Sequence, residues 1–268
     1  MGARQLTHSD AVLREVRDAV LTLTLNVPES RNALVPELER GLAEGIDEAA
    51  TSNVRALILS GRGSAFCAGA SMRELDGNEG RDLATLRKRA QVIPETILRP
   101  LYFLEKPVIA AINGWTVGAG IGIALAADYR ICSEDARFLF GFRRLALVPD
   151  LGVCWMLPRL VGYRAARDLL LRDREVGAWE AVELGLADEV VASGSLAERS
   201  FEIASELATG PTLALGFTKQ MLLRSHDLDL DSFLQYETLR QTILVGGEDH
   251  QEGVQALSDR RSPQFEGY

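Results

Sequence analysis

The alternation of apolar and polar residues near the start of the chain predicts two strands joined by a helix. Apolar and polar positions alternate over residues 19–26, as in a strand with one buried face, and residues 54–60 read as a second strand. Between these segments, apolar residues recur at helical spacing from about Pro36 to Ala50. This order is typical of a β-α-β unit.

The middle of the chain predicts further strands that are buried on both faces. Residues 108–114 form a short, nearly all-apolar run, the pattern of a strand inside a parallel sheet. A glycine-rich turn at 118–122 leads into a helix-like segment at 123–128, and residues 129–132 follow as another strand.

Helical spacing dominates the second half, and strand signals vanish from about Leu196 onward. Gly185 follows one of the expected helices as its C-terminal cap. The segments with helical apolar spacing are 165–172, 178–184, 197–207, 212–224 and 230–244. Alternating β and α units followed by helices predict an α/β fold, divided into a core at 1–195 and a helical segment at 196–268. Such helices need the core or another subunit to bury their apolar faces.

Composition and charge exclude several function classes. The 268 residues are 47% hydrophobic and 25% charged, with a net charge of −9, as expected for a globular protein that binds neither nucleic acid nor anionic membranes. No run approaches the roughly 18 apolar residues of a membrane span. The three cysteines have no CxxC spacing and the N-terminus lacks an apolar targeting region, so we expect a cytoplasmic location.

Two glycine-rich turns after strands suggest chemistry. The turn GAGIGIAL at 118–125 fails the dinucleotide pattern G-x-G-x-x-G because Ile123 stands at the last glycine position. It is consistent either with close helix packing or with free backbone N–H groups aimed at a developing negative charge. With the second turn, at 60–71, it could present two N–H donors to one oxygen, as in an oxyanion hole.

Few side chains are available for nucleophilic or metal chemistry. The three histidines, His8, His226 and His250, all lie outside the small-residue turns, so a Ser-His-Asp triad is not expected. Metal-ligand spacing is absent, and no metal site is predicted. Carboxylate chemistry remains, and Asp150 stands out within the apolar run FLFGFRRLALVPDLG, where desolvation should raise its pKa. The alternative is an ordinary Pro-Asp-x-Gly turn.

Several segments, in their order and spacing, resemble the crotonase superfamily, also named the enoyl-CoA hydratase/isomerase superfamily. The resemblance spans most of the chain, and its segments are ESRNAL at 29–34, AFCAGA at 65–70, KPVIAAING at 106–114, GAG at 118–120, LPRLVG at 157–162, residues 181–191 and Gly210-Pro211.

The resemblance implies a spiral of β-β-α turns, a C-terminal helical segment used in trimers or dimers of trimers, and an acyl-CoA thioester as substrate. No separate cofactor is expected, because CoA is part of that substrate. The backbone N–H groups of Ala70 and Ala119 are expected to hold the thioester oxygen. The residues expected beside the CoA arm are Cys67, Ala68, Gly69, Ser71 and Gly118.

Two departures from the family pattern bear on the reaction. Hydratases of the family carry two glutamates, and the matching positions here are Gly122 and Phe142, which we expect in the substrate pocket. Neither can move a proton, so ordinary hydration is disfavoured. Phe138, Phe140 and Trp155 are consistent either with an acyl pocket or with core, and the pair Arg143-Arg144 either with a solvated pair or with a contact to an anionic substrate or another subunit.

Asp150 falls where certain family isomerases carry a catalytic aspartate, and a 1,3-proton shift needs only one base. Dehalogenases of the family also place an aspartate there but couple it to a histidine, and this chain has none between residues 9 and 225. We therefore predict an enoyl-CoA isomerase with Asp150 as base. The alternatives are a hydratase or other crotonase-type enzyme that uses another carboxylate, such as Glu95 or Glu105, and an inactive acyl-CoA-binding subunit.

Overall fold

A six-stranded sheet forms the centre of the computed structural model, which describes residues 11–51, 53–71 and 82–267. Its strands lie in the order β1-β2-β3-β5-β7-β10, and β1 alone runs antiparallel to its neighbour. The strands are β1 (Val12–Arg17), β2 (Val20–Leu25), β3 (Ala56–Gly61), β5 (Val108–Ile112), β7 (Tyr129–Ser133) and β10 (Glu189–Val191). The strands predicted at 19–26, 54–60, 108–114 and 129–132 are thereby confirmed.

A second sheet of very short strands accompanies the first. Its order is β4-β6-β8-β9, with β4 at Ala65–Cys67, β6 at Trp115–Val117, β8 at Arg137–Leu139 and β9 at Val176–Gly177. Along the chain β3, β5 and β7 are each followed by one strand of this sheet, and helical residues come next. This repeated succession is the β-β-α spiral that the resemblance implied.

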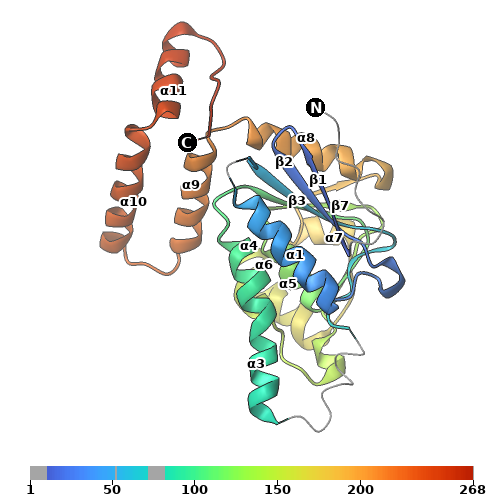
Figure 1. Ribbon diagram of the computed structural model, residues 1–268. Coiled ribbons are helices and arrows are strands. Elements are labelled where there is room, and N and C mark those ends of the chain that lie inside the picture. Colours follow the sequence, from blue (N-terminus) through green and yellow to red (C-terminus); the bar gives the residue numbers. More distant parts are fainter. Residues whose placement is uncertain (1–10, 52, 72–81, 268) are drawn as a thin grey trace.

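Helices cover both faces of the large sheet (Figure 1). On one face, α1 (Pro36–Ala49) buries Leu38, Leu42 and Ile46 in the larger of two apolar clusters. On the other face, α8 (Leu196–Ala208) packs on β2, β3, β5 and β7 and forms the smaller cluster with residues such as Ile58 and Ile109. The helix α8 was expected in the C-terminal segment, and in the structure it covers the sheet.

Further helices follow α1 in the core. They are α3 (Leu83–Ile93), a π-helix at Pro94–Leu98, α4 (Arg99–Tyr102), α5 (Ala119–Leu125), α6 (Val153–Arg172) and α7 (Ala178–Glu183). The helix α5 starts at Ala119, inside the turn expected at 118–122, so Gly118 is its N-cap and Gly120 and Gly122 lie in its first residues. The backbone of Gly162 is not helical and kinks α6, which begins twelve residues before the predicted 165–172.

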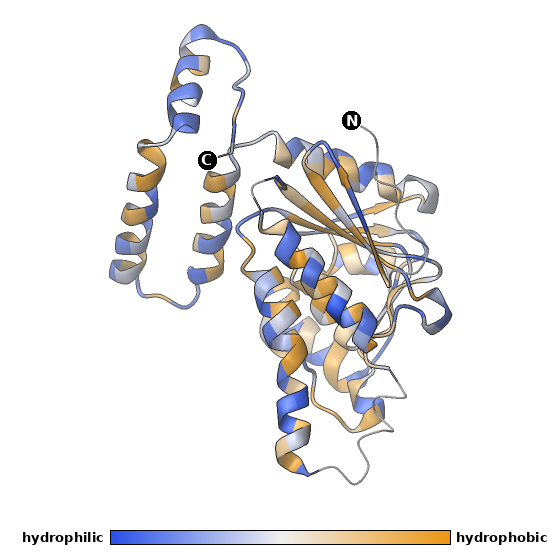
Figure 2. Ribbon diagram, viewed as in Figure 1, coloured by the Kyte–Doolittle hydropathy of each residue, from blue (hydrophilic) through white to orange (hydrophobic). Residues whose placement is uncertain are grey.

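The last three helices stand beside the core (Figure 1). They are α9 (Thr212–Arg224), α10 (Leu230–Val245) and α11 (Glu248–Asp259). A 2.9 Å ion pair from Lys219 to Asp128 joins α9 to the core. No residue of α10 is buried. Figure 2 shows that hydrophobic residues nevertheless occur along this helix.

Two expected absences can be examined in the described ranges. None of the helices there is long and apolar enough to cross a bilayer. The cysteines form no disulfide: Cys67 and Cys132 are buried as free thiols, and Cys154 is exposed.

Candidate active site

The first loop of the candidate site follows β4 and is held by a segment from the N-terminal part of the chain. The N–H of Ala68 donates to the carbonyl of Arg31 at 3.0 Å, and the N–H of Leu34 donates to the carbonyl of Gly69 at 2.8 Å. Leu34 and Ala70 form an isolated parallel bridge. The ESRNAL segment therefore acts as a backbone support for the loop.

Two asparagine side chains fix the turn just before β4. The buried amide of Asn32 donates to the carbonyl of Ala65 at 2.8 Å, and the amide of Asn113 donates to the carbonyls of Gly63 at 2.9 Å and Ala65 at 3.2 Å. Side chains from two distant segments thus supply hydrogen-bond donors to the carbonyls of Gly63 and Ala65.

The second loop joins β6 to α5. Gly118 has φ 53° and ψ −119°, a conformation that a residue with a β-carbon rarely adopts, and its N–H donates to the carbonyl of Leu139 at 3.1 Å. The chain then enters α5 directly, so the N–H of Ala119 is one of the donors that a helix N-terminus leaves without an internal partner.

The two loops pack backbone against backbone. A β-carbon at Gly69 would lie 2.6 Å from the carbonyl oxygen of Val117 and 3.1 Å from the nitrogen of Ala119, and one at Gly120 would lie 2.4 Å from the carbonyl oxygen of Cys67. Only glycine permits this approach. Within the described ranges, the N–H groups of Ala70 and Ala119 donate no hydrogen bond. Two backbone donors on loops that pack against each other are therefore left without a partner in these ranges, which is one requirement of an oxyanion hole.

The residues expected beside the CoA arm differ in their exposure. Ala68 and Gly118 are half-buried, whereas Gly69 and Ser71 are buried. Cys67 has no exposed surface, and burial raises the pKa of its thiol to about 12. The side chain of Cys67 therefore supports the loop from inside the core. All five assignments to the CoA arm stay predictions.

Asp150 lies in the turn that leads from the small sheet into α6. Its carbonyl accepts the N–H of Val153 at 3.0 Å, at the start of that helix. Burial raises the pKa of the carboxyl group above its usual value, and no ion pair in the described ranges involves it. Asp150 and its neighbours Leu147 and Val148 are exposed in the single chain, so the apolar enclosure expected from the sequence is formed only in part, by the buried Leu151.

Gly122 brings this turn next to the oxyanion loops. A β-carbon at Gly122 would lie 2.6 Å from Cβ and 2.7 Å from the carbonyl oxygen of Leu151. Gly122 is the fourth residue of α5, and it contacts Leu151, which follows Asp150 in the chain. The place that a side chain at this position would need is filled by Leu151.

The aromatic residues of the region lie mostly in the core. Phe138 and Phe140 are each 1% exposed, and Phe142 is buried in the same apolar cluster. Trp155 is partly exposed and stacks edge-on against Tyr102. The core interpretation therefore holds for Phe138 and Phe140, and the assignment of Phe142 to a substrate pocket stays a prediction.

The structure shows two carboxyl groups, those of Glu39 and Asp173, whose partly or fully buried surroundings the sequence patterns did not indicate. Burial raises the pKa of Glu39 on α1, with a partly opposing effect from Arg89. Asp173 is buried at the C-terminal end of α6 and accepts the N–H of Gly141 at 2.6 Å. Neither residue belongs to a recognisable motif, so only the fold reveals its surroundings.

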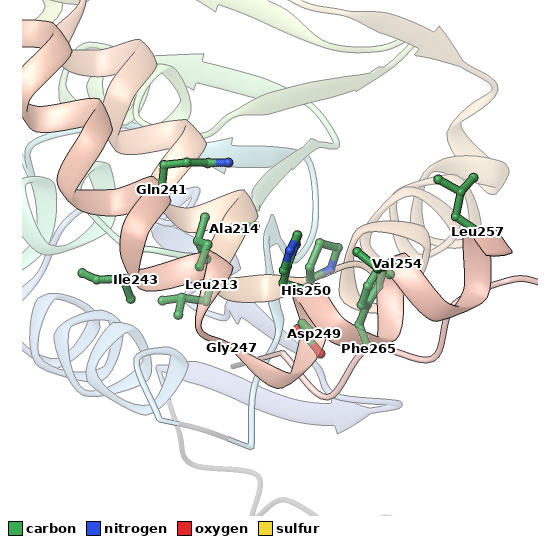
Figure 3. A pocket seen from close by; sticks show the side chains of 13 residues that line it. Leu213, Ala214, Gln241, Ile243, Gly247, Asp249, His250, Val254, Leu257 and Phe265 are labelled. Atoms are coloured by element: carbon green, nitrogen blue, oxygen red, sulfur yellow. The ribbon is translucent and has the colours of Figure 1, made fainter.

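Two of the three histidines lie in the described C-terminal part of the chain, His226 in the turn between α9 and α10 and His250 in α11. His226 borders a cavity of about 500 Å³ between α9 and the core, together with Tyr102 and Lys219. His250 borders a second cavity of about 360 Å³ formed by α9, α10 and α11, seen in Figure 3. His8 lies outside the described residues. Within those residues, no group of three or more His, Cys, Asp or Glu side chains could hold a metal ion.

Comparison with known proteins identifies the family of the chain. The family model for enoyl-CoA hydratase/isomerase matches residues 15–268, and the chain belongs to that family. It is 36% identical over 257 residues to the 1,2-epoxyphenylacetyl-CoA isomerase of Escherichia coli K12, covering 96% of this chain and 98% of the relative. It is 34% identical over 258 residues to the (E)-benzylidenesuccinyl-CoA hydratase of Thauera aromatica, covering 96% and 99%. The crystal structure of an enoyl-CoA hydratase from Bacillus anthracis matches with a TM-score of 0.89 at 32% identity, over 96% of this chain and all of that one.

Proposed function

We propose that the protein is an acyl-CoA isomerase that shifts a double bond through an enolate, with Asp150 as its single base. The observation that carries this proposal is the contact between Gly122 and Leu151. It sets one carboxyl-bearing turn beside the oxyanion loops and leaves no room for a glutamate side chain on α5.

The reaction needs one base and one electron sink. The ionised carboxylate of Asp150 takes a proton from C2 of a 3-enoyl thioester, and the electrons move to the thioester oxygen. The N–H groups of Ala70 and Ala119 stabilise the resulting dienolate, and one such donor is worth about 3–4 kcal/mol in the transition state. The protonated Asp150 then returns its proton to C4, which yields the 2-enoyl thioester and restores the carboxylate.

The raised pKa of Asp150 suits both halves of this cycle. A carboxylic acid near its usual pKa of 3.8 would bind the proton too weakly to return it efficiently, whereas desolvation brings the pKa closer to the working pH. A positioned general base of this kind contributes about 10²–10⁴-fold to the rate.

A hydratase is the second candidate, and one observation favours it. Glu95 lies on the π-helix Pro94–Leu98, and Leu98 of that helix comes within 3.4 Å of a β-carbon built on Gly152. Single-turn π-helices occur frequently at functional sites. Glu95 is exposed on an element that touches the Asp150 turn, so it is the carboxylate to test for activation of water. Glu105 lies elsewhere, where its carbonyl faces Gly216 of α9.

Product analysis separates these functions. We expect 3-hexenoyl-CoA to be converted to 2-hexenoyl-CoA, and Asp150→Asn to abolish conversion while an unreactive acyl-CoA thioether still binds. A 3-hydroxyacyl product from 2-hexenoyl-CoA, lost in Glu95→Gln, would support the hydratase instead. Binding without turnover of either compound would indicate an inactive acyl-CoA-binding subunit. A phenyl-bearing substrate belongs in the panel, because the names of both curated relatives describe aromatic acyl groups.

We also propose that α9, α10 and α11 mediate assembly into a trimer or a dimer of trimers. The lack of buried residues on α10 and the exposure of Leu230, Leu239 and Ile243 support this proposal. Isolated apolar faces of this kind are unfavourable in water. Light scattering of the purified protein is expected to give three or six times the mass of one chain, and a monomeric mass would contradict the proposal.

A further inference from the structure

The pair Arg143-Arg144 reaches the C-terminal end of α6. The guanidinium of Arg143 donates to the carbonyl of Leu171 at 3.2 Å. The Nε of Arg144 donates to the carboxylate of Asp173 at 2.6 Å, and its Nη2 donates to the carbonyl of the same residue at 3.4 Å. Both cations therefore meet the negative end of a helix, where unpaired carbonyl groups favour positive charge. The sequence did not indicate this contact of the pair within the chain.

Asp173 joins this contact to the backbone of the turn. Its Oδ1 accepts the N–H of Gly141 at 2.6 Å while its Oδ2 accepts from Arg144. The Asp173 side chain is only 4% exposed, whereas that of Arg144 is 62% exposed. One buried carboxylate thus binds both the first residue of the turn and a charged side chain three residues further on, in charge-assisted hydrogen bonds.

The backbone of Asp173 shows that its side chain matters. Asp173 ends α6 with φ 54° and ψ 49°, a left-handed conformation in which glycine is the favoured residue. Glycine would end the helix without strain, so the aspartate offers no advantage as a cap. What distinguishes the aspartate at this position is the carboxylate that holds Gly141 and Arg144.

The turn that starts at Gly141 has few other attachments before it reaches Asp150. Leu147 donates its N–H to the carbonyl of Phe142 at 3.0 Å, and the carbonyl of Asp150 accepts from Val153. Among the described residues, the N–H groups of Val148, Leu151 and Gly152 donate no hydrogen bond, Pro149 has no N–H, and the N–H of Asp150 bonds the carboxyl group of the same residue. The position of the turn therefore depends on its two ends, the contact with Asp173 and the start of α6.

We propose that Asp173 and Arg144 are positioning residues that fix the 141–150 turn and thereby place the carboxylate of Asp150 over the acyl group. This inference rests on the proposed function, because it assigns the turn its role through Asp150. Asp173 and Arg144 act through the turn and contact no reacting atom.

Hydrogen exchange measures the attachment of the turn directly, whether or not Asp150 is the base. In Asp173→Gly, which suits the left-handed backbone and is expected to fold, the amides of 141–147 should exchange about 10-fold faster or more. Asp173→Asn keeps an acceptor for Gly141 but loses the ion pair, and should show a smaller increase, as should Arg144→Gln. Asp168→Asn is the matched control, because it removes exposed ion pairs to Arg172 and Arg174 at the same helix end and touches no residue of the turn.

Kinetics then tests the link to Asp150. In Asp173→Gly, the kcat of isomerisation is expected to fall about 10-fold to 100-fold, because a displacement of the Asp150 carboxylate by about 1 Å has an effect of this size. The Kd of an alkyl-CoA thioether should change little. Asp173→Asn should retain more activity than Asp173→Gly, and the control should match the wild type.

Wild-type exchange in Asp173→Gly would overturn the inference. Faster exchange with unchanged kcat would overturn it too, provided that Asp150→Asn is inactive. An active Asp150→Asn would instead refute the proposed function, and exchange of the turn would still decide whether Asp173 holds it.

Discussion

Substitution of Gly69 by alanine is expected to separate the two backbone donors of the oxyanion hole. Gly69 has φ 79°, and its new β-carbon would lie 2.6 Å from the carbonyl oxygen of Val117. The left-handed backbone costs about 1–2 kcal/mol for alanine, and overpacking against a fixed carbonyl adds about 1–3 kcal/mol. The loops must move apart, which displaces the N–H groups of Ala70 and Ala119.

The expected loss in kcat follows from the displacement of the N–H groups of Ala70 and Ala119. Because removal of one oxyanion donor lowers kcat by about 10²–10³-fold, we expect a loss in this range for Gly69→Ala. A saturating kinetic assay of a 3-enoyl-CoA measures kcat, and urea denaturation measures the free energy of unfolding. An alkyl-CoA thioether, which lacks the carbonyl oxygen, should bind to the variant with a Kd similar to its Kd for the wild type.

Gly63→Ala is the matched control. Gly63 lies in the turn before β4 with φ 84°, and its β-carbon would approach only Pro28, at 3.1 Å from the β-carbon of that residue. This variant should lose a similar amount of backbone stability and keep its kcat. If Gly69→Ala stays within about threefold of the wild-type kcat, or if Gly63→Ala loses as much, the two-loop oxyanion hole is refuted.

Four further changes test the surroundings of the site and the attachment of α9. Gly122→Ala should lower both kcat and the free energy of unfolding, the latter by about 1–3 kcal/mol in urea titrations, because its β-carbon overlaps Leu151; wild-type values would show that this contact is unimportant. The isomerisation rate should fall as the pH drops through the raised pKa of Asp150, since the base must be ionised, and a flat acid limb would argue against this base. A raised pKa also means that ionised Asp150 destabilises the folded state, so Asp150→Asn should be more stable than the wild type at pH 7 and should lose this advantage below pH 3.8, whereas a less stable variant at pH 7 would contradict this sign. Lys219→Ala should lower the free energy of unfolding by about 3 kcal/mol, because it leaves Asp128 without its buried partner, and a loss under about 1 kcal/mol would show that α9 is held otherwise.

Apolar periodicity predicted the elements that are long enough to show it. The strand at 108–114 and the helix from Pro36 were confirmed because each buries a continuous apolar face. The short strands β4, β6, β8 and β9 contain only two or three residues, too few for any period to appear. The edge strand β1 reads VLREVR and is mostly exposed, so it carries little apolar signal.

The candidate site was predictable where backbone geometry requires glycine. Gly69 and Gly120 permit the close approach of the two loops, Gly118 adopts a positive φ, and their pattern indicated donors before the fold was known. The exposure of Asp150 was not predictable, because neighbours in sequence do not determine which side of a turn faces water. The role of Asp173 could not be predicted either, since its partners lie 29 and 32 residues away and form no motif.

The structure of a complex with an unreactive acyl-CoA analogue tests the central claim most directly. With the thioester oxygen between the N–H groups of Ala70 and Ala119, we expect the carboxylate of Asp150 within about 3.5 Å of C2 and C4 of the acyl chain, the reach of a proton transfer. An Asp150 carboxylate directed into solvent, with Glu95 or another carboxyl group at those carbons, would contradict the account.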